Sequence, residues 1–303
     1  MTKPTFDLQS HSLHSDGVLP PADVVANAAA AGVKLLALSD HDTVDGVDEA
    51  IAAGIRHGVA IVPATEISSV DGRYEDLHIL GYGIDHRDPQ LAERLLDARA
   101  DRELRAERMA AKLNELGFEV DDTLLAARRA QGKPIGRPHL AEAVLRHPAN
   151  AARLEREGHD DVSSFIPAYL IPGTPGYLAR THPTVFEAIG WIHDAGGLAI
   201  WAHPYWDLDT DEEVIGALDR FAAAGIDGVE AFYPTHSEAQ TRVVVQRANE
   251  LRLLTTGSSD YHGPEHRLFR TFLAHDTYEY VPDLSQLEEA AASAAAQTGG
   301  VGS

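Results

Sequence analysis

Histidine and carboxylate residues recur along this chain directly after short apolar stretches, where they could bind divalent metal ions. The first such segment, "DLQSHSLHSDG", begins at Asp7 and carries Gln9, His11 and Asp16. Later apolar stretches carry or end in residues of the same kind: Asp40 with His41, Glu66, His78, His203, and Asp260 with His262. Imidazole and carboxylate groups without thiolates suit two or three divalent cations, and the chain contains no cysteine.

Each of these residues alone has a simpler explanation. A single histidine at a strand end commonly makes a structural hydrogen bond, and an aspartate such as Asp40 or Asp260 can cap the following helix. Capping does not explain why so many successive stretches carry potential ligands. The pattern therefore predicts a multinuclear metal site, in which Glu66 is a candidate bridging carboxylate because an anion between two cations reduces their repulsion.

Short apolar runs alternate with helical patterns over most of the chain. Strands are expected at 5–10, 34–39, 60–68, 77–83, 198–203, 228–233 and 253–259. Continuous apolar strands that alternate with helices indicate a parallel sheet, and seven of them favour a (β/α) barrel over an open doubly wound sheet. Because parallel strands end on one face of such a barrel, we expect the candidate ligands to converge there.

The middle of the chain departs from this alternation. A long charged helix is expected at 91–116, with further helical segments at 122–130 and 138–146. The predicted organisation is a discontinuous α/β barrel at 1–87 and 179–290, a helical insertion at 88–178, and a flexible tail at 291–303.

Composition limits the partners of the protein. The 47 acidic and 25 basic residues give a net charge of −22, which disfavours a stable complex with nucleic acid. A small anionic substrate is compatible with this charge, because bound cations invert the local field. No apolar run approaches the roughly 20 residues of a membrane span, and the segment "MTKPTFDLQS" lacks the apolar core of a signal peptide. We therefore expect a cytoplasmic protein without a membrane partner.

Taken together, the motifs resemble those of the PHP (polymerase and histidinol phosphatase) family of metal-dependent phosphoesterases. They are "DLQSHSLHSDG", "LSDHDT", "ATEIS", "HILGYGI", "AHP" and "SDYHG". The resemblance covers the whole predicted barrel and implies a distorted seven-stranded (β/α) barrel with a trinuclear site. It implies three ligand sets: Gln9, His11, Glu66 and Asp260 for one ion; Glu66, His78 and His203 for a second; Asp16, His41 and His262 for a third. Asp40 and His236 would then orient these ligands or transfer protons.

A segment of the insertion extends the resemblance. "IGRPHLAEAVL", at 135–145, is similar to a segment of the subgroup that hydrolyses nucleoside phosphates and the 5′ ends of short RNA, where the insertion acts as a lid. Arg137 and His139 stand at the start of a predicted helix, so a guanidinium, an imidazole and the helix N-terminus could bind one phosphate. The alternative is a proline-initiated helix with an ordinary surface arginine.

Two positions depart from the family pattern. The family usually has histidine where this chain has Gln9, and a neutral amide oxygen is a weaker ligand that favours Mn²⁺ over Zn²⁺. Relatives often have Gly-Arg after "AHP", whereas this chain has Tyr205 and Trp206. Arg267 or Arg270 could replace the missing arginine. The aromatic pair could stack on a base or a sugar, or it could pack in the core.

The sequence thus predicts a metal-dependent phosphoesterase that hydrolyses a phosphomonoester of a nucleotide, of the AMP or nucleoside 3′,5′-bisphosphate type, by metal-activated water. Two or three divalent ions are expected, Mn²⁺ above Zn²⁺, Fe²⁺ or Mg²⁺. The expected catalytic residues are Asp40, His236, Arg137 and His139, and the expected substrate-binding residues are Arg137, His139, Arg267 and Tyr205. Two alternatives stay open: a 5′–3′ exonuclease on short 5′-phosphorylated RNA, and a non-catalytic metal- or nucleotide-binding module with a degenerate site.

Overall fold

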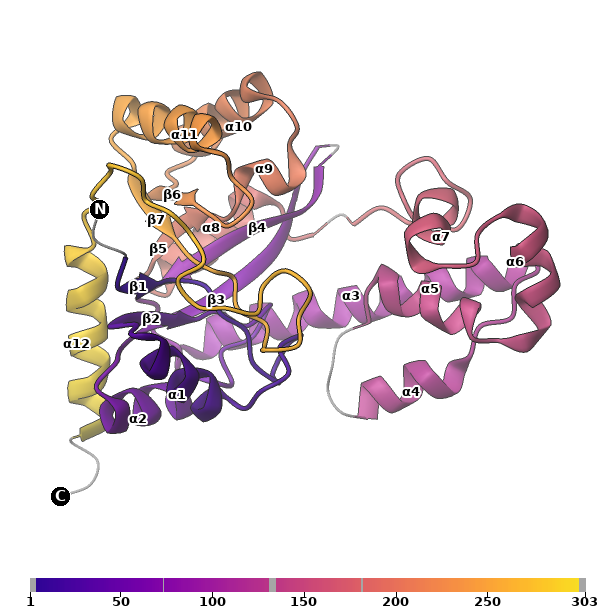
Figure 1. Cartoon of the computed structure of the whole chain (residues 1–303), viewed down its shortest axis with the longest axis horizontal. Coiled ribbons are helices and arrows are strands. Elements are labelled where there is room, and N and C mark those ends of the chain that lie inside the picture. Colours follow the sequence, from indigo (N-terminus) through magenta and orange to yellow (C-terminus); the bar gives the residue numbers. More distant parts are fainter. Residues whose placement is uncertain (1–3, 73, 131–134, 181, 300–303) are drawn as a thin grey trace. The chain divides into compact units, whose positions relative to one another are not determined.

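The computed structural model describes residues 4–72, 74–130, 135–180 and 182–299 (Figure 1). The chain separates into two compact units. Unit 1 comprises Met1–Leu96 and Pro183–Ser303, and unit 2 comprises Asp97–His182. Within the described residues, no helix is both long and apolar enough to cross a membrane.

Unit 1 is built on a seven-stranded sheet whose strands neighbour one another in chain order. The strands are β1 (Phe6–Asp7), β2 (Leu35–Leu38), β3 (Ala60–Asp71), β4 (Tyr74–Tyr82), β5 (Leu198–Trp201), β6 (Gly228–Phe232) and β7 (Leu254–Gly257). The chain next to β1 meets the chain at β7: the amide of Leu8 donates to the carbonyl of Gly257 at 3.1 Å, and Ser10 forms a parallel bridge with Tyr261. The sheet is therefore a nearly closed barrel, which confirms the predicted fold class.

Strand β4 corrects one part of the prediction, because it runs antiparallel to both of its neighbours. Only two residues separate Asp71 from Tyr74 in the sequence, which permits a hairpin but leaves no length for a crossover helix. His78 lies within β4 and pairs in register with Ser68 of β3. It therefore belongs to the interior of an antiparallel strand rather than to the end of a parallel one.

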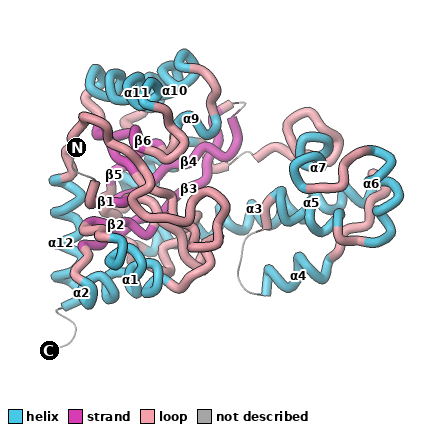
Figure 2. Tube along the Cα trace, in the orientation of Figure 1, coloured by secondary structure: helices cyan, strands magenta, loops and turns pink. Residues whose placement is uncertain are grey.

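Helices lie outside the strands of unit 1 (Figure 2). They are α1 (Pro21–Ala31), α2 (Val47–His57), α8 (Val185–Asp194), α9 (Pro204–Asp207), α10 (Asp211–Ala223) and α11 (Glu238–Leu251). Side-chain caps fix the starts of three of them: Thr184, Thr210 and Ser237 each accept a hydrogen bond from the backbone of the first turn. Their apolar faces, such as Val214, Leu218 and Phe221 of α10, pack into the barrel core.

The C-terminal region corrects a second part of the prediction. Residues expected in a flexible tail from 291 onward belong to helix α12 (Ser285–Gly299), and only 300–303 lie outside the described residues. Leu287, Ala291 and Ala294 of this helix are buried, and the helix packs against β3 and α2. The segment is rich in alanine, the residue with the highest helix propensity, and burial of one face stabilises it further.

Unit 2 is helical and has its own hydrophobic core. It contains most of α3 (Pro89–Glu115), followed by α4 (Asp122–Ala130), α5 (Arg137–Leu145), the 3₁₀ turn at Pro148–Asn150, α6 (Ala151–Glu157) and α7 (Val162–Tyr169). Leu113, Phe118 and Phe165 are among its fully buried side chains. The first residues of α3 belong to unit 1, where Leu91 and Leu95 pack in the barrel core, so the unit begins later than the predicted boundary at 88.

Candidate metal centre

Side chains predicted to bind metal converge in unit 1. Three overlapping groups have ligand atoms within 4.8 Å of one another: His11, Asp16, His41 and His262; His41, Glu66 and His78; and His11, Glu66 and Asp260. His203 adjoins the second group, with its Nε2 atom 3.4 Å from Glu66 Oε1 and 3.3 Å from His78 Nδ1. Segments as far apart in sequence as those of His11 and His262 thus supply one compact cluster of imidazoles and carboxylates.

Glu66 is the centre of this cluster. Its side chain is fully buried on β3. One carboxylate oxygen, Oε2, lies 3.1 Å from His11 Nε2, and the other, Oε1, lies 2.7 Å from His78 Nδ1. A carboxylate that faces imidazoles with both oxygens has the geometry of a bridge between two cation positions.

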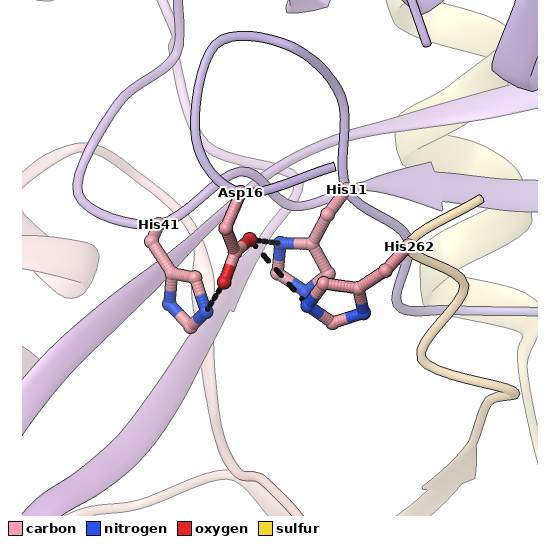
Figure 3. Close-up of side chains that lie close together, drawn as sticks. All are labelled: His11, Asp16, His41 and His262. Carbon is pink, nitrogen blue, oxygen red and sulfur yellow. Dashed lines mark ion pairs between the residues drawn. The ribbon is translucent and has the colours of Figure 1, made fainter. Parts of the chain in front are cut away.

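Asp16 has a more exposed side chain than Glu66 or Asp260, and Figure 3 shows it between His41 on one side and His11 and His262 on the other. Its carboxylate lies 3.4 Å from His262 Nε2 and 3.6 Å from both His41 Nε2 and His11 Nδ1. These side chains come from the loops that follow β1, β2 and β7, and the close-up shows them turned toward the Asp16 carboxylate. The Asp16 carboxylate and these three imidazoles could therefore bind one cation together.

Buried ligand atoms test whether this donor set fits metal ions. His11 Nε2 lies 3.1 Å from Glu66 Oε2 and 3.0 Å from Asp260 Oδ1, yet none of these three buried atoms makes a hydrogen bond of good geometry in the described part of the chain. Converging buried polar atoms without hydrogen bonds are rare in folded proteins and mark a place for an ion or water. Nitrogen and carboxylate oxygen ligands without sulfur match divalent cations such as Mn²⁺ or Zn²⁺. The residues present therefore fit a metal centre.

Opposite charges within the cluster shift the pKa values of several candidate ligands. Burial alone would lower the pKa of His203, but the Glu66 carboxylate raises it to about 9. Burial would raise the pKa of Asp260, yet His262 and His11 hold it at about 2. His41 differs, since burial lowers its pKa to about 4 and leaves its ring neutral. Divalent cations would take the place of the protons on the charged imidazoles.

Asp40 orders the loop that carries His11 and Asp16. The side chain is almost fully buried. Its carboxylate accepts hydrogen bonds from the amide of Ser12 at 2.7 Å, the hydroxyl of Ser12 at 2.6 Å and the hydroxyl of Ser15 at 2.6 Å. These hydrogen bonds hold the loop in place, and the choice between positioning and proton transfer for Asp40 stays a prediction.

Glu230 holds His203 in an unusual backbone conformation. His203 has a positive φ of 30°, in the left-handed region that non-glycine residues seldom adopt. Its amide donates to Glu230 Oε2 at 2.9 Å, and Ser258 Oγ donates to Glu230 Oε1 at 2.5 Å. Burial raises the pKa of Glu230 to about 8. Strain of this kind persists at functional sites when neighbouring groups fix the backbone.

Two further residues orient Asp260, and the sequence reasoning did not assign them a role. Asp7 accepts hydrogen bonds from the amides of Ser259 at 2.7 Å and Leu273 at 2.8 Å, which anchors the loop after β7. The hydroxyl of Tyr233 donates to Asp260 Oδ2 at 2.7 Å. The signal for Asp7 was a carboxylate placed in an otherwise apolar strand, but nothing in the sequence indicated which amides it binds.

Four other predicted site residues of unit 1 differ in burial and in hydrogen bonding: Gln9, His236, Tyr205 and Arg267. Gln9 is buried, with its Oε1 atom 3.4 Å from Ser258 Oγ, and its role as a ligand stays a prediction. Burial lowers the pKa of His236 to about 4, so its ring is neutral at neutral pH and does not carry the proton that an acid would donate. The hydroxyl of Tyr205 donates to Asp211, and Arg267 is exposed on the loop after β7.

Arg137 and His139 lie in unit 2 at the start of α5. The amide of Gly136 donates to His139 Nδ1 at 2.9 Å, so this imidazole takes part in capping the helix. The segment therefore begins a helix where the sequence predicted one, and phosphate binding by these two residues stays a prediction.

Comparisons with known proteins find similarity over most of the chain. The model of the PHP domain matches residues 7–135. The 3′,5′-nucleoside bisphosphate phosphatase of Chromobacterium violaceum is 36% identical over 262 residues, which cover 86% of this chain and 87% of that protein. A 5′–3′ exoribonuclease of Haemophilus influenzae is 33% identical over 265 residues, covering 87% of this chain and 92% of the relative.

A solved structure extends the similarity over nearly the full length. It is that of a Chromobacterium violaceum protein described as an amidohydrolase, with bound sulfate and no metal. It matches this chain with a TM-score of 0.78 and 31% identity, and covers 95% of this chain and 97% of its own. Because relatives more than 30% identical span most of its length, the chain belongs to the PHP family. It is a hydrolase that acts on phosphoric ester bonds.

Proposed function

We propose that this phosphoesterase releases phosphate from a nucleotide, either AMP or a nucleoside 3′,5′-bisphosphate. The observation that carries the proposal is the convergence of imidazoles and carboxylates on the buried Glu66. The chain that builds this cluster is 36% identical to a phosphatase of nucleoside bisphosphates. A phosphomonoester suits such a centre, because its terminal phosphate presents several oxygens to cations.

The proposed centre contains three cation positions, with Mn²⁺ as the favoured ion. Glu66 would be shared between the position near His11 and Asp260 and the position near His78 and His203. Asp16, His41 and His262 would hold the third position, and the amide oxygen of Gln9 would complete the first. Divalent cations in these places would polarise the phosphoryl oxygens and lower the pKa of a water nucleophile.

Other residues would prepare the site and bind the phosphate. Asp40 keeps the loop of His11 and Asp16 in place through its hydrogen bonds to Ser12 and Ser15. Glu230 keeps the His203 backbone in its left-handed conformation. Arg137 and His139 are proposed to bind the phosphate oxygens, and Arg267 to supply a further guanidinium.

One alternative substrate has support from a relative. The similarity to a 5′–3′ exoribonuclease favours hydrolysis at the 5′ end of short RNA by the same centre. The net charge of −22 opposes the binding of long polyanions. Release of phosphate from AMP and from adenosine 3′,5′-bisphosphate, compared with release of mononucleotides from a 5′-phosphorylated pentanucleotide, each with Mn²⁺, would separate the two. Faster turnover of the pentanucleotide than of both mononucleotides would overturn the phosphatase proposal.

Substitution of Glu66 by glutamine tests the centre itself. Glu66→Gln removes the shared negative charge, so we expect bound metal per chain to fall by at least one ion and turnover of AMP to fall roughly 100-fold or more. Elemental analysis of the purified protein measures the metal, and circular dichroism verifies the fold. The matched control is Glu93→Gln, the same change at an exposed position of α3, which should alter neither quantity.

Two results would argue against an active metal centre. A Glu66→Gln variant with the metal content and activity of the unsubstituted protein would exclude Glu66 as a shared ligand. Fewer than two divalent ions per unsubstituted chain, with no hydrolysis of any of the three substrates, would favour a degenerate binding module.

A further inference from the structure

A layer of aromatic side chains lies against the metal centre. The ring of Phe269 is 5.7 Å from that of His262, and the ring of Tyr233 is 5.2 Å from that of His203. Trp206 packs against the outer side of this layer, 5.5 Å from the Phe269 ring and 6.4 Å from the Tyr233 ring. Two ring-to-ring steps therefore lead from a candidate metal ligand to the Trp206 indole.

Trp206 is exposed although its aromatic neighbours are buried. Its relative exposure is 49%, against 6% for Phe269 and 3% for Tyr233. The amide of Trp206 donates to the carbonyl of His203 at 2.8 Å, within the short helix α9, and this holds the backbone next to the metal centre. Covering an exposed aromatic ring with a planar partner is favourable, so Trp206 offers a surface on which such a partner could stack.

Other exposed apolar side chains lie in loops that also carry candidate metal ligands. Leu13, Val18 and Leu268 are all exposed, and they lie in the loops after β1 and β7 that also carry His11, Asp16 and His262. The amide of Val18 donates to the carbonyl of His262 at 3.0 Å, so these two loops are joined beside the centre. Exposed apolar side chains do not stabilise a bound phosphate group. They would favour binding of the uncharged part of a substrate that is attached to the phosphate.

The adjacent Tyr205 is less suited to bind that part. Its hydroxyl donates to Asp211 at 2.5 Å, and its ring lies edge-on to His236 at 5.5 Å. Its exposure is intermediate, so part of its surface is already covered. Of the two neighbouring aromatic residues, Trp206 is the one that presents its ring to solvent.

We propose that Trp206 is a stacking platform for the nucleobase of the substrate, while the phosphate occupies the metal centre. The inference rests on the proposed phosphatase function and specifies its substrate as a nucleotide with a planar base, rather than any small phosphomonoester. In a mononucleotide a single ribose separates base and phosphate, which matches a platform placed one aromatic layer away from the candidate ligands. Stacking on an aromatic side chain accepts any base, so the platform selects nucleotides without choosing among them.

The test compares AMP with ribose 5-phosphate, which carries the same phosphate and sugar but no base. Trp206→Ala should lower kcat/KM for AMP about tenfold, mainly through KM, and leave ribose 5-phosphate within about twofold. Trp206→Phe keeps a stacking ring and should recover most of the loss. Ile55→Ala, at an exposed apolar residue of α2, is the control and should change neither substrate.

A binding measurement gives a second readout that does not need turnover. Trp201 is buried and Trp191 is partly buried, so Trp206 is the tryptophan most exposed to added ligands. Adenosine should quench the intrinsic fluorescence, whereas ribose should not, and Trp206→Phe should remove the quenching.

Different outcomes separate failure of the platform from failure of the phosphatase proposal. Equal losses for AMP and ribose 5-phosphate in Trp206→Ala, or no loss for either, would overturn the platform while leaving a phosphatase. If the unsubstituted protein releases phosphate neither from these two compounds nor from adenosine 3′,5′-bisphosphate, the phosphatase proposal fails, and quenching by adenosine still decides whether Trp206 binds a base.

Discussion

At the scale of single residues, the candidate site depends on a buried carboxylate that imidazoles surround. Glu66 has no exposure, and burying an unpaired charge of this kind would cost several kcal/mol. His11, His78 and His203 each place a ring nitrogen within 3.4 Å of its oxygens, which offsets that cost in the metal-free protein. The same atoms are those a pair of cations would use, so the metal-free fold already holds the ligands close together.

A prediction at Asp40 distinguishes positioning from proton transfer. Asp40→Asn loses part of the hydrogen bonding to Ser12 and Ser15, so we expect metal affinity and kcat each to fall roughly 10- to 100-fold. Because the residue does not transfer a proton in this view, the pH profile of kcat/KM should keep its shape. Metal titration and initial rates across pH measure both. Loss of one limb of the profile, with unchanged metal affinity, would show that Asp40 is a catalytic acid or base.

A prediction at His203 concerns pH and metal binding. Burial would lower its pKa, but Glu66 raises it to about 9 in the metal-free protein, above the usual 6.5. A raised histidine pKa stabilises the fold fully below pH 6.5 and loses this contribution as pH rises through 9, a change of roughly 3 kcal/mol at most. Binding of a cation requires the neutral ring, so affinity should increase by up to about tenfold per pH unit in the same window.

Calorimetric titration of the metal-free protein with Mn²⁺ between pH 6.5 and 8.5 measures this effect. Proton release should accompany binding, and denaturant unfolding of the metal-free protein should show lower stability at the higher pH. A Mn²⁺ affinity that does not change with pH would mean that His203 is already neutral or is not a ligand. Replacement of His203 by asparagine should reduce the slope.

At the scale of elements, the β3–β4 hairpin is what brings Glu66 and His78 together. The two strands pair in antiparallel register, with Glu66 opposite Leu80 and Ser68 opposite His78. Residues two apart on a strand share a face, so the side chains of Glu66 and His78 meet across the pair. An antiparallel strand in an otherwise parallel barrel thus contributes a ligand from its middle.

Helix α12 gives the element-scale prediction. Leu287 has a relative exposure of 2% and belongs to the barrel core, so Leu287→Ala should lower the free energy of unfolding by about 2–4 kcal/mol. Urea unfolding followed by circular dichroism measures the change. Val281→Ala, at a residue 93% exposed shortly before the helix, should stay within about 0.5 kcal/mol. If Leu287→Ala matched this control, helix α12 would be held only loosely on the barrel, in line with the flexible tail that the sequence predicted from 291 onward.

At the scale of the whole molecule, the chain combines two units with separate cores. Unit 1 contains the whole candidate metal centre, and unit 2 contains Arg137 and His139 at the start of α5. The net charge of −22 would repel a free anion, so attraction of a phosphorylated substrate must come from local cations. Metal ions in unit 1 and the arginine of unit 2 are the proposed sources.

The prediction at this scale assigns unit 2 a part in substrate binding. Arg137→Ala removes a guanidinium that could form charged hydrogen bonds with the phosphate, so we expect KM for AMP to rise about tenfold while bound metal per chain stays unchanged. Steady-state kinetics and elemental analysis measure the two quantities. Arg146→Ala, at an exposed position just after the same helix, is the control. An unchanged KM in Arg137→Ala would leave unit 2 without a role in binding phosphate.

The sequence predicted the candidate ligands well. It predicted strand direction and the C-terminal helix less well, because both depend on tertiary contacts. Spacing and residue type placed His11, Glu66 and His203 next to apolar strands, and these side chains cluster in the structure. The predicted direction of β4 was wrong because an apolar strand has the same sequence pattern in parallel and in antiparallel pairing. The helix at 285–299 was missed because alanine-rich, weakly patterned segments gain helical stability only when one face is buried.

By itself, the sequence determined which chemical groups are available: imidazole and carboxylate without thiol, on seven strands, with a family pattern that identifies a phosphoesterase. Only the tertiary structure decided which of these groups face one another. It gave Asp40 and Glu230 their hydrogen-bonding partners, and it left Trp206 exposed beside buried rings. The physical reason is that residue type fixes what a side chain can bind. Its partners, its burial and its pKa depend on neighbours that lie far away along the chain.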